Sequence, residues 1–232
     1  MSVLRCFIGY DEGERIAYHS CVESLIQHST EPLSITPLSL GNLTGYWEKH
    51  TDGSNAFTYS RFLVPYLCGW NGWALYLDGD MILKDNVVKL FELRNEYMAA
   101  MVVKHDYKTQ HPIKYRGAPN QDYPCKNWSS VILWNCGSWV NRCLTPERIS
   151  MEKGAFLHRF MWVAHNKVGS LPLEWNWLVG EYEKNDQAKL LHYTLGIPVF
   201  KGYEDCDHAE DWNKVSKEVV SHEEHTQQRR VA

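Results

Sequence analysis

Two aspartates separated by one glycine, Asp78-Gly79-Asp80, directly follow the apolar run over residues 73–77. Two carboxylates held this close repel each other, and a divalent cation bound between them removes the repulsion. The small Gly79 lets a ligand's phosphates approach the backbone. An acidic turn with no ligand would use the same residue types, but acids at the carboxyl end of a strand in an α/β fold usually serve a binding site. We therefore predict a metal site at Asp78 and Asp80.

A histidine ends a second short apolar run, Leu190-Leu191-His192, and a Gly196-x-Pro198 turn follows it. Its imidazole could supply a third metal ligand. Mixed carboxylate and imidazole ligands with positions left for phosphate oxygens suit Mn²⁺, with Mg²⁺ as the alternative. A lone histidine is more often a hydrogen-bonded structural residue than a ligand, so the residues around it must decide.

The elements around these motifs alternate between strand and helix. Apolar runs predict strands over 3–8, 34–40, 73–77, 97–103, 130–134 and 189–191, and helical spacing predicts helices over 14–28, 57–67 and 146–164. Such alternation predicts an α/β fold, a Rossmann-like layered domain with a mostly parallel central sheet, where ligands bind beyond the carboxyl ends of the strands. We expect one domain over 1–212 and a polar C-terminal helix or tail over 213–232.

Composition excludes several classes of protein. Of the 232 residues, 44% are hydrophobic and 22% are charged, which is typical of a folded globular chain. A net charge of −4 gives no general electrostatic reason to bind nucleic acid. No apolar run resembles a signal peptide or a transmembrane segment, so we expect a cytoplasmic protein with reduced cysteines. The aromatic content of 13% suggests a densely packed core, carbohydrate stacking, or both.

The order of the motifs resembles that of glycosyltransferase family 8, the GT-A-fold enzymes that include glycogenin and bacterial lipopolysaccharide galactosyl- and glucosyltransferases. The resemblance extends from residue 3 to about residue 203, and it is greatest to the compact bacterial and phage branch. Its segments are Phe7-Ile8-Gly9-Tyr10-Asp11, Tyr59-Ser60-Arg61, Asp78-Gly79-Asp80, Asn135-Cys136-Gly137 and His192-Tyr193-Thr194-Leu195-Gly196.

This resemblance implies a retaining hexosyltransferase that moves a sugar from a nucleotide-diphosphate sugar, typically a UDP-sugar, to a glycan or another hydroxyl acceptor. The metal ligands would be Asp78, Asp80 and His192. Arg61 or Lys201 would add positive charge against the leaving diphosphate, and the base would stack near Tyr10. The implied donor-binding residues are Gly9, Tyr10, Asp11, Tyr59, Arg61, Asp78, Gly79, Asn135, Gly137, Gly196 and Lys201.

Two departures from the family pattern concern the reacting groups. The usual H-x-x-G-x-x-K segment is altered here, which leaves Lys201 as the nearest lysine, and a D-Q-D triplet is missing. We propose Glu174 and Asn176 as substitutes beside Asp78 and Asp80 in the catalytic set, with the flanking Trp175 and Trp177 at the surface as an acceptor platform. Without an acid that can act as nucleophile, we expect a front-face displacement in which the departing diphosphate accepts the acceptor's proton.

Two alternatives belong to other classes. A haloacid-dehalogenase-like phosphatase would use Asp78 as its nucleophile, but that family places the strand at the start of the chain and a Thr or Val where Ile82 stands. A non-catalytic carbohydrate-binding protein would use exposed tryptophans and would not need the acidic pair. Glycosyl transfer explains more of the sequence than either.

Overall fold

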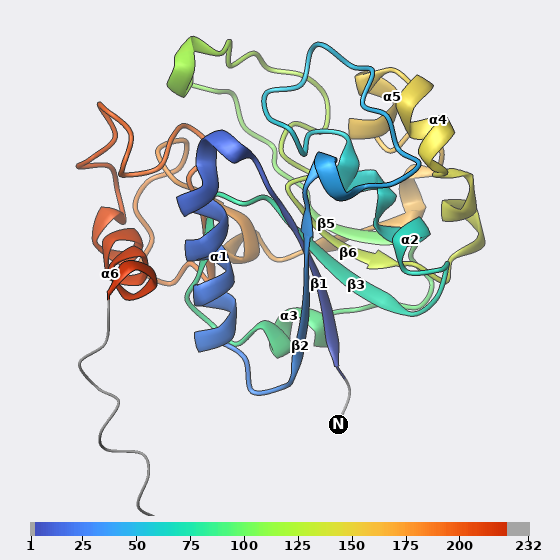
Figure 1. Ribbon diagram of the computed structural model, residues 1–232, viewed down its shortest axis with the longest axis horizontal. Helices are drawn as coiled ribbons and strands as arrows, with labels where there is room; N and C mark the ends of the chain where they lie inside the picture. The colour runs from blue at the N-terminus through green and yellow to red at the C-terminus, as the bar shows by residue number, and fades with distance from the viewer. Residues whose placement is uncertain (1–2, 222–232) are drawn as a thin grey trace, which may run out of the picture.

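The protein forms a layered α/β domain in a computed structural model that describes residues 3–221, apart from the side chain of Arg116 (Figure 1). Residues 222–232 of the expected tail lie outside the described residues. The elements are β1 (Leu4–Gly9), α1 (Arg15–Gln27), β2 (Leu33–Leu38), α2 (Val64–Leu67), β3 (Trp73–Leu77), β4 (Met81–Leu83), α3 (Val87–Glu92), β5 (Ala100–Val103), β6 (Val131–Asn135), α4 (Pro146–Met151), α5 (Gly154–His158), β7 (Val168–Leu171), β8 (Trp177–Leu178), β9 (Leu190–His192) and α6 (Ala209–Val220).

The main sheet has six strands in the order β2-β1-β3-β6-β5-β7. The pairs β1–β2, β1–β3 and β5–β7 are parallel, whereas β6 runs antiparallel to both of its neighbours, β3 and β5. The sheet is thus mostly parallel, as predicted. The direction of β6 matters for the site, because its carboxyl end lies at the edge of the sheet opposite to the carboxyl ends of β1 and β3.

A second sheet of three short strands, β4-β9-β8, stands beside the first. Strand β4 begins one residue after Asp80 and pairs antiparallel with β9, with Met81 opposite His192. This register brings the acidic segment and the histidine together although 112 positions separate Asp80 from His192 along the chain.

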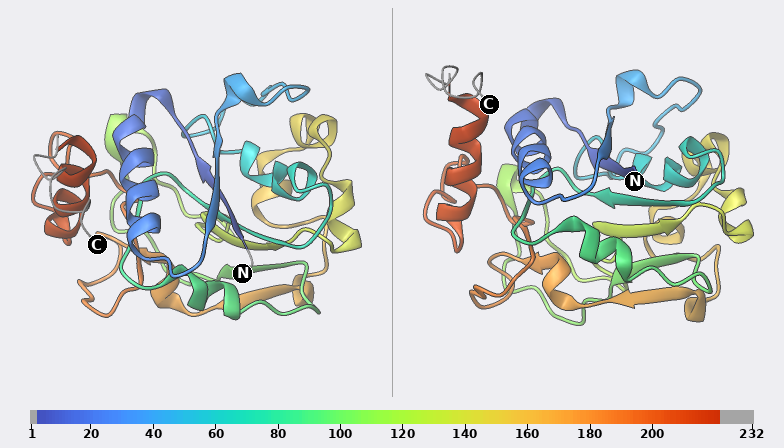
Figure 2. Two further views of the ribbon diagram at one scale, coloured as in Figure 1. Left: turned by 60° about the horizontal axis from the view of Figure 1, so that its bottom comes forward. Right: turned by 90° about the horizontal axis from the view of Figure 1, so that it is seen from below.

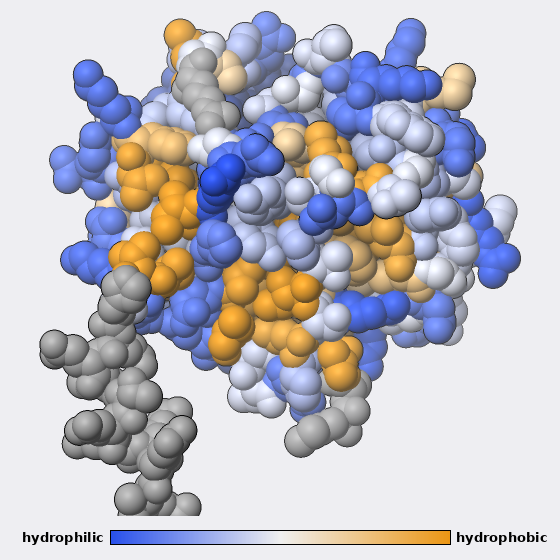
Figure 3. Space-filling model, viewed as in Figure 1, coloured by the Kyte–Doolittle hydropathy of each residue, from blue (hydrophilic) through white to orange (hydrophobic). Residues whose placement is uncertain are grey.

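Alternation along the strands gives the main sheet two apolar faces. Phe7, Tyr76 and Trp134 point to the face covered by α2, α4 and α5, and Ile8 and Leu75 point to the face covered by α1 and α3. Helix α6 packs beside α1 at the edge of the molecule (Figures 1 and 2). On the face shown in Figure 3, apolar side chains gather in patches that polar residues separate.

Two predicted helices are shorter than expected. The segment over 57–67 forms a 3-10 turn, Ser60–Leu63, followed by the single turn of α2. The helix predicted over 146–164 divides into α4 and α5, because Glu152 and Lys153 adopt extended backbone conformations. Gly154 then packs against Tyr59 so closely that a Cβ there would lie 2.6 Å from the phenol oxygen. The helical periodicity therefore continues past a break in the backbone at Glu152 and Lys153.

Over residues 3–221, no helix is long and apolar enough to cross a membrane.

Candidate metal centre and its cavity

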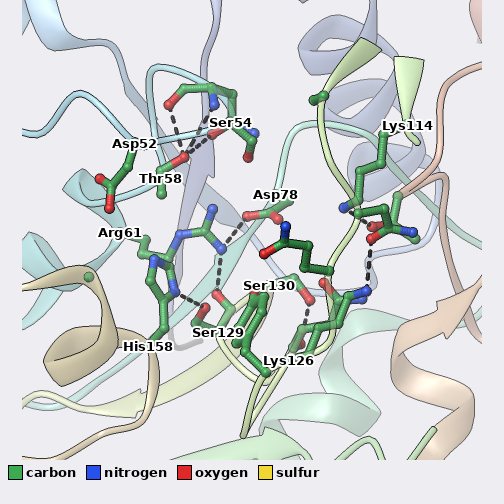
Figure 4. A pocket seen from close by; sticks show the side chains of 18 of the residues that line it. Asp52, Ser54, Thr58, Arg61, Asp78, Lys114, Lys126, Ser129, Ser130 and His158 are labelled. Carbon is green, nitrogen blue, oxygen red and sulfur yellow. Dashed lines mark hydrogen bonds and ion pairs between the residues drawn. The ribbon is translucent and has the colours of Figure 1, made fainter. Parts of the chain in front are cut away.

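A cavity of about 520 Å³ opens where the two sheets meet (Figure 4). Five stretches that are distant in sequence line it, within residues 52–61, 78–80, 114–130, 154–159 and 192–194. Its size is within the usual range for small-molecule sites. The carboxyl end of β3 leads into this cavity, as expected for a ligand site in an α/β fold.

Asp78, Asp80 and His192 form a cluster in this cavity, and their ligand atoms all lie within 4.8 Å of one another. His192 Nε2 lies 3.4 Å from Asp80 Oδ1 and 4.0 Å from Asp78 Oδ2. The backbone fixes this arrangement, because the Tyr193 amide donates to the Asp80 carbonyl at 3.0 Å beside the β4–β9 pair. The three residues predicted as metal ligands are therefore brought together.

Asn176 sets which nitrogen of His192 carries the proton. The side-chain amide of Asn176 donates to the Asn127 carbonyl at 3.3 Å and to Ser130 Oγ at 2.8 Å. A carbonyl only accepts, so the NH₂ group must face Asn127, and Asn176 Oδ1 must face His192 Nδ1, 3.0 Å away. His192 Nδ1 is then the donor. In the neutral ring, Nε2 consequently points an unprotonated lone pair at the two carboxylates.

The electrostatics of the cluster call for a cation. Burial lowers the pKa of His192 to about 3, so the imidazole is neutral at neutral pH. Burial also raises the pKa values of Asp78 and Asp80, which shows that their charged forms are poorly solvated. Asp80 Oδ1 is buried and has no hydrogen-bond partner among the described residues. An unpartnered carboxylate oxygen beside an imidazole lone pair fits a divalent metal.

Asp78 is held in place by its other oxygen. Asp78 Oδ1 accepts a hydrogen bond from the Tyr76 hydroxyl at 2.6 Å and forms an ion pair with Arg61 Nη1 at 2.9 Å. The guanidinium of Arg61 lies against the rings of Phe57 and Tyr76 and donates to the Ser129 carbonyl at 2.9 Å. Arg61 therefore orients Asp78, and only Oδ2 remains turned toward His192.

The glycines near the metal cluster are required by packing. A Cβ on Gly79 would lie 2.5 Å from the Gly9 carbonyl oxygen, and one on Gly9 would lie 2.4 Å from the ring of Phe57. Tyr10 makes an edge contact with Tyr18, with ring centroids 5.3 Å apart. None of Gly9, Tyr10 and Gly79 lines the cavity. Their close approach to neighbouring backbone and rings shapes the wall behind it.

Asp11 and Tyr59 organise the segment over 52–58 that forms one side of the cavity. Asp11 accepts hydrogen bonds from the Gly13 amide at 2.8 Å and the Ala56 amide at 2.9 Å. Tyr59 lines the cavity and donates its hydroxyl to Asp52 at 2.5 Å. Of the predicted donor-binding residues, Tyr59, Arg61 and Asp78 reach the cavity.

Asn135 and Gly137 are not brought to the cavity. Asn135 ends β6 and pairs with Trp73 at the start of β3, while the metal cluster follows the end of β3. Its side chain donates to the Met98 carbonyl at 3.0 Å. The antiparallel direction of β6 places this carboxyl end at the far edge of the sheet.

The residues proposed near the acceptor lie outside the cavity lining. Glu174 pairs with Lys189 at 3.1 Å and does not line the cavity. Trp175 is only 1% exposed and packs in the core, so the predicted surface platform is wrong for this residue. Trp177 is half-buried and donates its ring N–H to the Glu183 carbonyl. Asn176 acts through His192 and does not line the cavity.

Gly196 and Lys201 also lie away from the cavity lining, and Lys201 is exposed. Among the residues whose side chains the structure describes, the cations that line it besides Arg61 are Lys114, Lys126 and Arg159. Sequence reasoning missed all three. Their only signal is that Lys114 and Lys126 belong to a long non-periodic segment between β5 and β6, and long loops in compact domains are often functional.

Comparison with known proteins agrees with this fold. No protein-family model matches the sequence. The bifunctional glycosyltransferase WbbM aligns with 93% of the chain at 18% identity and a TM-score of 0.67, and the glycosyltransferase GlyE of Streptococcus pneumoniae with 93% at 17% identity and a TM-score of 0.61. The chain spans only 50% and 60% of these two proteins. The galactosyltransferase LgtC, solved with donor and acceptor sugar analogs, matches 95% of this chain and 98% of its own at 10% identity and a TM-score of 0.57.

These similarities establish a GT-A fold. A much nearer relative is the protein CDI of Arabidopsis thaliana, which is 40% identical over 217 residues, covering 90% of this chain and 84% of CDI. At that identity and coverage, the chain belongs to the same protein family as Arabidopsis thaliana CDI.

Proposed function

We propose that this protein is a metal-dependent glycosyltransferase that moves a sugar from a nucleotide-diphosphate sugar, with UDP as the expected nucleotide, to a hydroxyl acceptor such as a glycan. The observation that carries the proposal is the lone pair of His192 Nε2 facing the unpartnered oxygen of Asp80 in a cavity of suitable size. The GT-A fold and the motif order support it, and they favour a relationship to glycosyltransferase family 8.

Asp78, Asp80 and His192 would hold the metal, with Mn²⁺ as the expected ion. A divalent cation at this position supplies Lewis-acid stabilisation for a leaving diphosphate. Tyr76 and Arg61 keep Asp78 oriented, and Asn176 keeps His192 in the tautomer that can bind. Because both supports are buried, the ligand set is organised before any substrate arrives.

Retention of configuration is part of the proposal, by front-face displacement. Among the described residues, the carboxylates that line the cavity are Asp52, Asp78 and Asp80. Two of these belong to the metal cluster, and Asp52 accepts a hydrogen bond from the Tyr59 hydroxyl. With none left over to attack the sugar, the bond to the acceptor oxygen forms on the face that the diphosphate leaves. The departing phosphate oxygen takes the proton of the acceptor hydroxyl.

The test is calorimetric titration of Mn²⁺, followed by a screen of UDP-sugars for Mn²⁺-dependent hydrolysis and transfer. The wild-type protein should bind Mn²⁺ and release UDP from at least one donor. Asp80→Asn should lose Mn²⁺ binding, whereas the matched change Asp186→Asn, at an exposed position, should keep it. Equal Mn²⁺ affinity in Asp80→Asn and wild type would exclude the metal site.

A further inference from the structure

We propose that Lys114 binds the diphosphate of the donor and neutralises the leaving group, the task that the sequence alone suggests for Arg61 or Lys201. This inference rests on the proposed function. It assigns diphosphate binding to a residue of the segment between β5 and β6, which is distant in sequence from the proposed metal ligands.

Lys114 reaches the same cavity as the metal cluster. Its ammonium donates to Thr194 Oγ1 at 3.0 Å, and Thr194 stands two residues after His192. An ammonium has three N–H donors, and Thr194 is the one hydrogen-bond partner that the described residues give it. In the view of Figure 4, Arg61 and Lys114 lie on opposite sides of Asp78. Lys114 can therefore face a ligand that also binds the metal.

The backbone around Lys114 is fixed to the segment that carries His192. The Tyr115 amide donates to the Leu195 carbonyl at 2.9 Å, and the Tyr115 ring stacks on Phe200 with centroids 5.0 Å apart. The Lys114 amide also closes a turn onto the Ala118 carbonyl at 2.8 Å. These contacts hold the lysine against the segment that follows β9.

Lys126 places a second ammonium in the same cavity. Its Nζ donates to Asn120 Oδ1 at 2.8 Å and lies 3.7 Å from Asp122 Oδ1. Lys126 is buried and Lys114 is half-buried, and desolvation lowers the pKa of each. Lys114 interacts electrostatically with Asp80 and Asp78, so a site for an anion adjoins the site for a metal, and Lys126 adds a second positive charge to the same cavity lining. A diphosphate bound to a metal at the Asp78, Asp80 and His192 cluster would lie within the cavity that Lys114 also lines.

The two residues expected from the sequence are less suited to this task. The guanidinium of Arg61 already binds Asp78 and the Ser129 carbonyl, and it is covered by two aromatic rings. Lys201 is exposed and does not line the cavity. Lys114 combines a position in the cavity lining with N–H donors left for a ligand.

The experiment compares Lys114→Met with Lys201→Met in the full chain, by calorimetry with Mn²⁺ present and UDP, UMP or inorganic pyrophosphate as the probe. Lys114→Met should weaken UDP binding by about 10- to 100-fold, as expected for loss of a charge-assisted hydrogen bond. UMP binding should change by less than about threefold, because the second phosphate is missing. Lys201→Met should bind all three probes like wild type.

Mn²⁺ titrated alone separates a ligand role from a structural one. Removing a positive charge near Asp80 should leave Mn²⁺ affinity unchanged or increase it, whereas damage to the fold would decrease it. Lys114→Arg, which keeps the charge, should recover part of the UDP affinity. Unchanged UDP affinity in Lys114→Met, or a loss in Lys201→Met instead, would overturn the proposal.

Pyrophosphate distinguishes this proposal from the proposed function. If wild type binds Mn²⁺ and pyrophosphate in a Lys114-dependent way but binds no nucleotide, the anion site stands and the nucleotide-sugar function fails. If Lys114→Met binds pyrophosphate and UDP as tightly as wild type, while Mn²⁺-dependent transfer is observed, the function stands and the role of Lys114 fails.

Discussion

Buried polar side chains gather at both ends of β3, and the two groups differ in one respect. At the start of the strand, Asn141 donates to the carbonyls of Ala99 at 2.9 Å and Asn135 at 3.0 Å, and it accepts from the Trp162 ring N–H at 3.2 Å. Past the end of the strand, Asp80 Oδ1 has no partner among the described residues. Asn141 thus satisfies its hydrogen bonds within the protein, whereas Asp80 leaves a carboxylate oxygen without a donor in the described part of the chain.

This difference separates polar residues that serve the fold from those that serve a ligand. A buried polar atom left without a partner is destabilising by about 1–3 kcal/mol. The ring N–H groups of Trp134 and Trp212 also lack a partner within residues 3–221 but lie in the apolar core, whereas Asp80 Oδ1 belongs to a carboxylate that lines a cavity beside His192, where a ligand can supply the missing contact. Asn135, which the motif order suggested for donor binding, belongs to the satisfied group. Its bond to the Met98 carbonyl explains its presence without any ligand.

The largest expected effect comes from Asp80→Asn. Loss of a metal ligand should lower the Mn²⁺-dependent rate of donor turnover by about 1,000-fold or more, a size typical of removing a main source of transition-state charge stabilisation. The change also removes like-charge repulsion with Asp78, so the melting temperature in EDTA should stay equal to that of wild type or rise. Initial rates and thermal melts measure the two effects.

Mn²⁺ should raise the melting temperature of wild type but not of Asp80→Asn, because only the wild-type native state gains a ligand. Normal turnover by Asp80→Asn, or a marked loss of stability in EDTA, would place Asp80 in the structural group and remove the contrast between the two ends of β3.

Asn141→Leu should have the opposite profile. The substitution removes two donated bonds and leaves the partly buried Trp162 ring N–H without its acceptor, so the free energy of unfolding should fall by about 2–4 kcal/mol. The folded fraction should keep its Mn²⁺ affinity. Urea unfolding measures the first quantity and calorimetry the second. A stable Asn141→Leu protein with reduced Mn²⁺ affinity would contradict the assignment.

Asn176 tests the boundary between the two groups. Its hydrogen bonds are satisfied, yet one of them holds His192 in the metal-binding tautomer. Asn176→Leu should weaken Mn²⁺ binding by about 10- to 100-fold, as is usual for residues that support a metal ligand. Asn176→Gln is the matched control that keeps an amide. If Mn²⁺ affinity is unchanged in Asn176→Leu while stability falls, Asn176 serves the fold alone.

The acidic pair was predictable because its signal is local: two carboxylates adjoin an apolar strand. His192 needed the motif order as well, since its partner strand lies more than a hundred residues away. Asn135 could not be placed, because nothing local in residues 130–137 shows that β6 runs antiparallel, and direction decides which edge of the sheet its end reaches. The position of Lys114 in the cavity depends on tertiary contacts of Tyr115 with Leu195 and Phe200. Such contacts leave no local pattern in the sequence.

The tryptophans show the same limit of prediction from local sequence. Trp134 and Trp175 are both fully buried, but only Trp134 lies within a long apolar run. Trp175 stands between Glu174 and Asn176, and polar neighbours suggested exposure. In the structure Glu174 turns to Lys189 while Trp175 enters the core. Sequence neighbours on a short turn point in different directions, so a polar flank does not predict an exposed ring.

The smallest predicted effect concerns pH and His158, a cavity residue whose Nδ1 has a partner in Ser129 Oγ at 2.8 Å. Burial lowers the pKa of His158 to about 3, below the value of about 6.5 expected in the unfolded chain. Between these values the unfolded state binds the extra proton. The stability that His158 contributes is therefore complete above pH 6.5 and decreases as the pH falls toward 3.

His158→Gln should accordingly show a shallower loss of stability between pH 6.5 and 4 than wild type, measured by urea unfolding in EDTA. The difference between the two proteins isolates this residue, because His105, whose pKa is also lowered to about 3, and the buried aspartates titrate in both. Mn²⁺ affinity at pH 7.5 should not change, since His158 has a partner and is not in the metal cluster. Parallel stability profiles would mean that the ring titrates normally. A loss of Mn²⁺ affinity would show that His158 also supports the metal site.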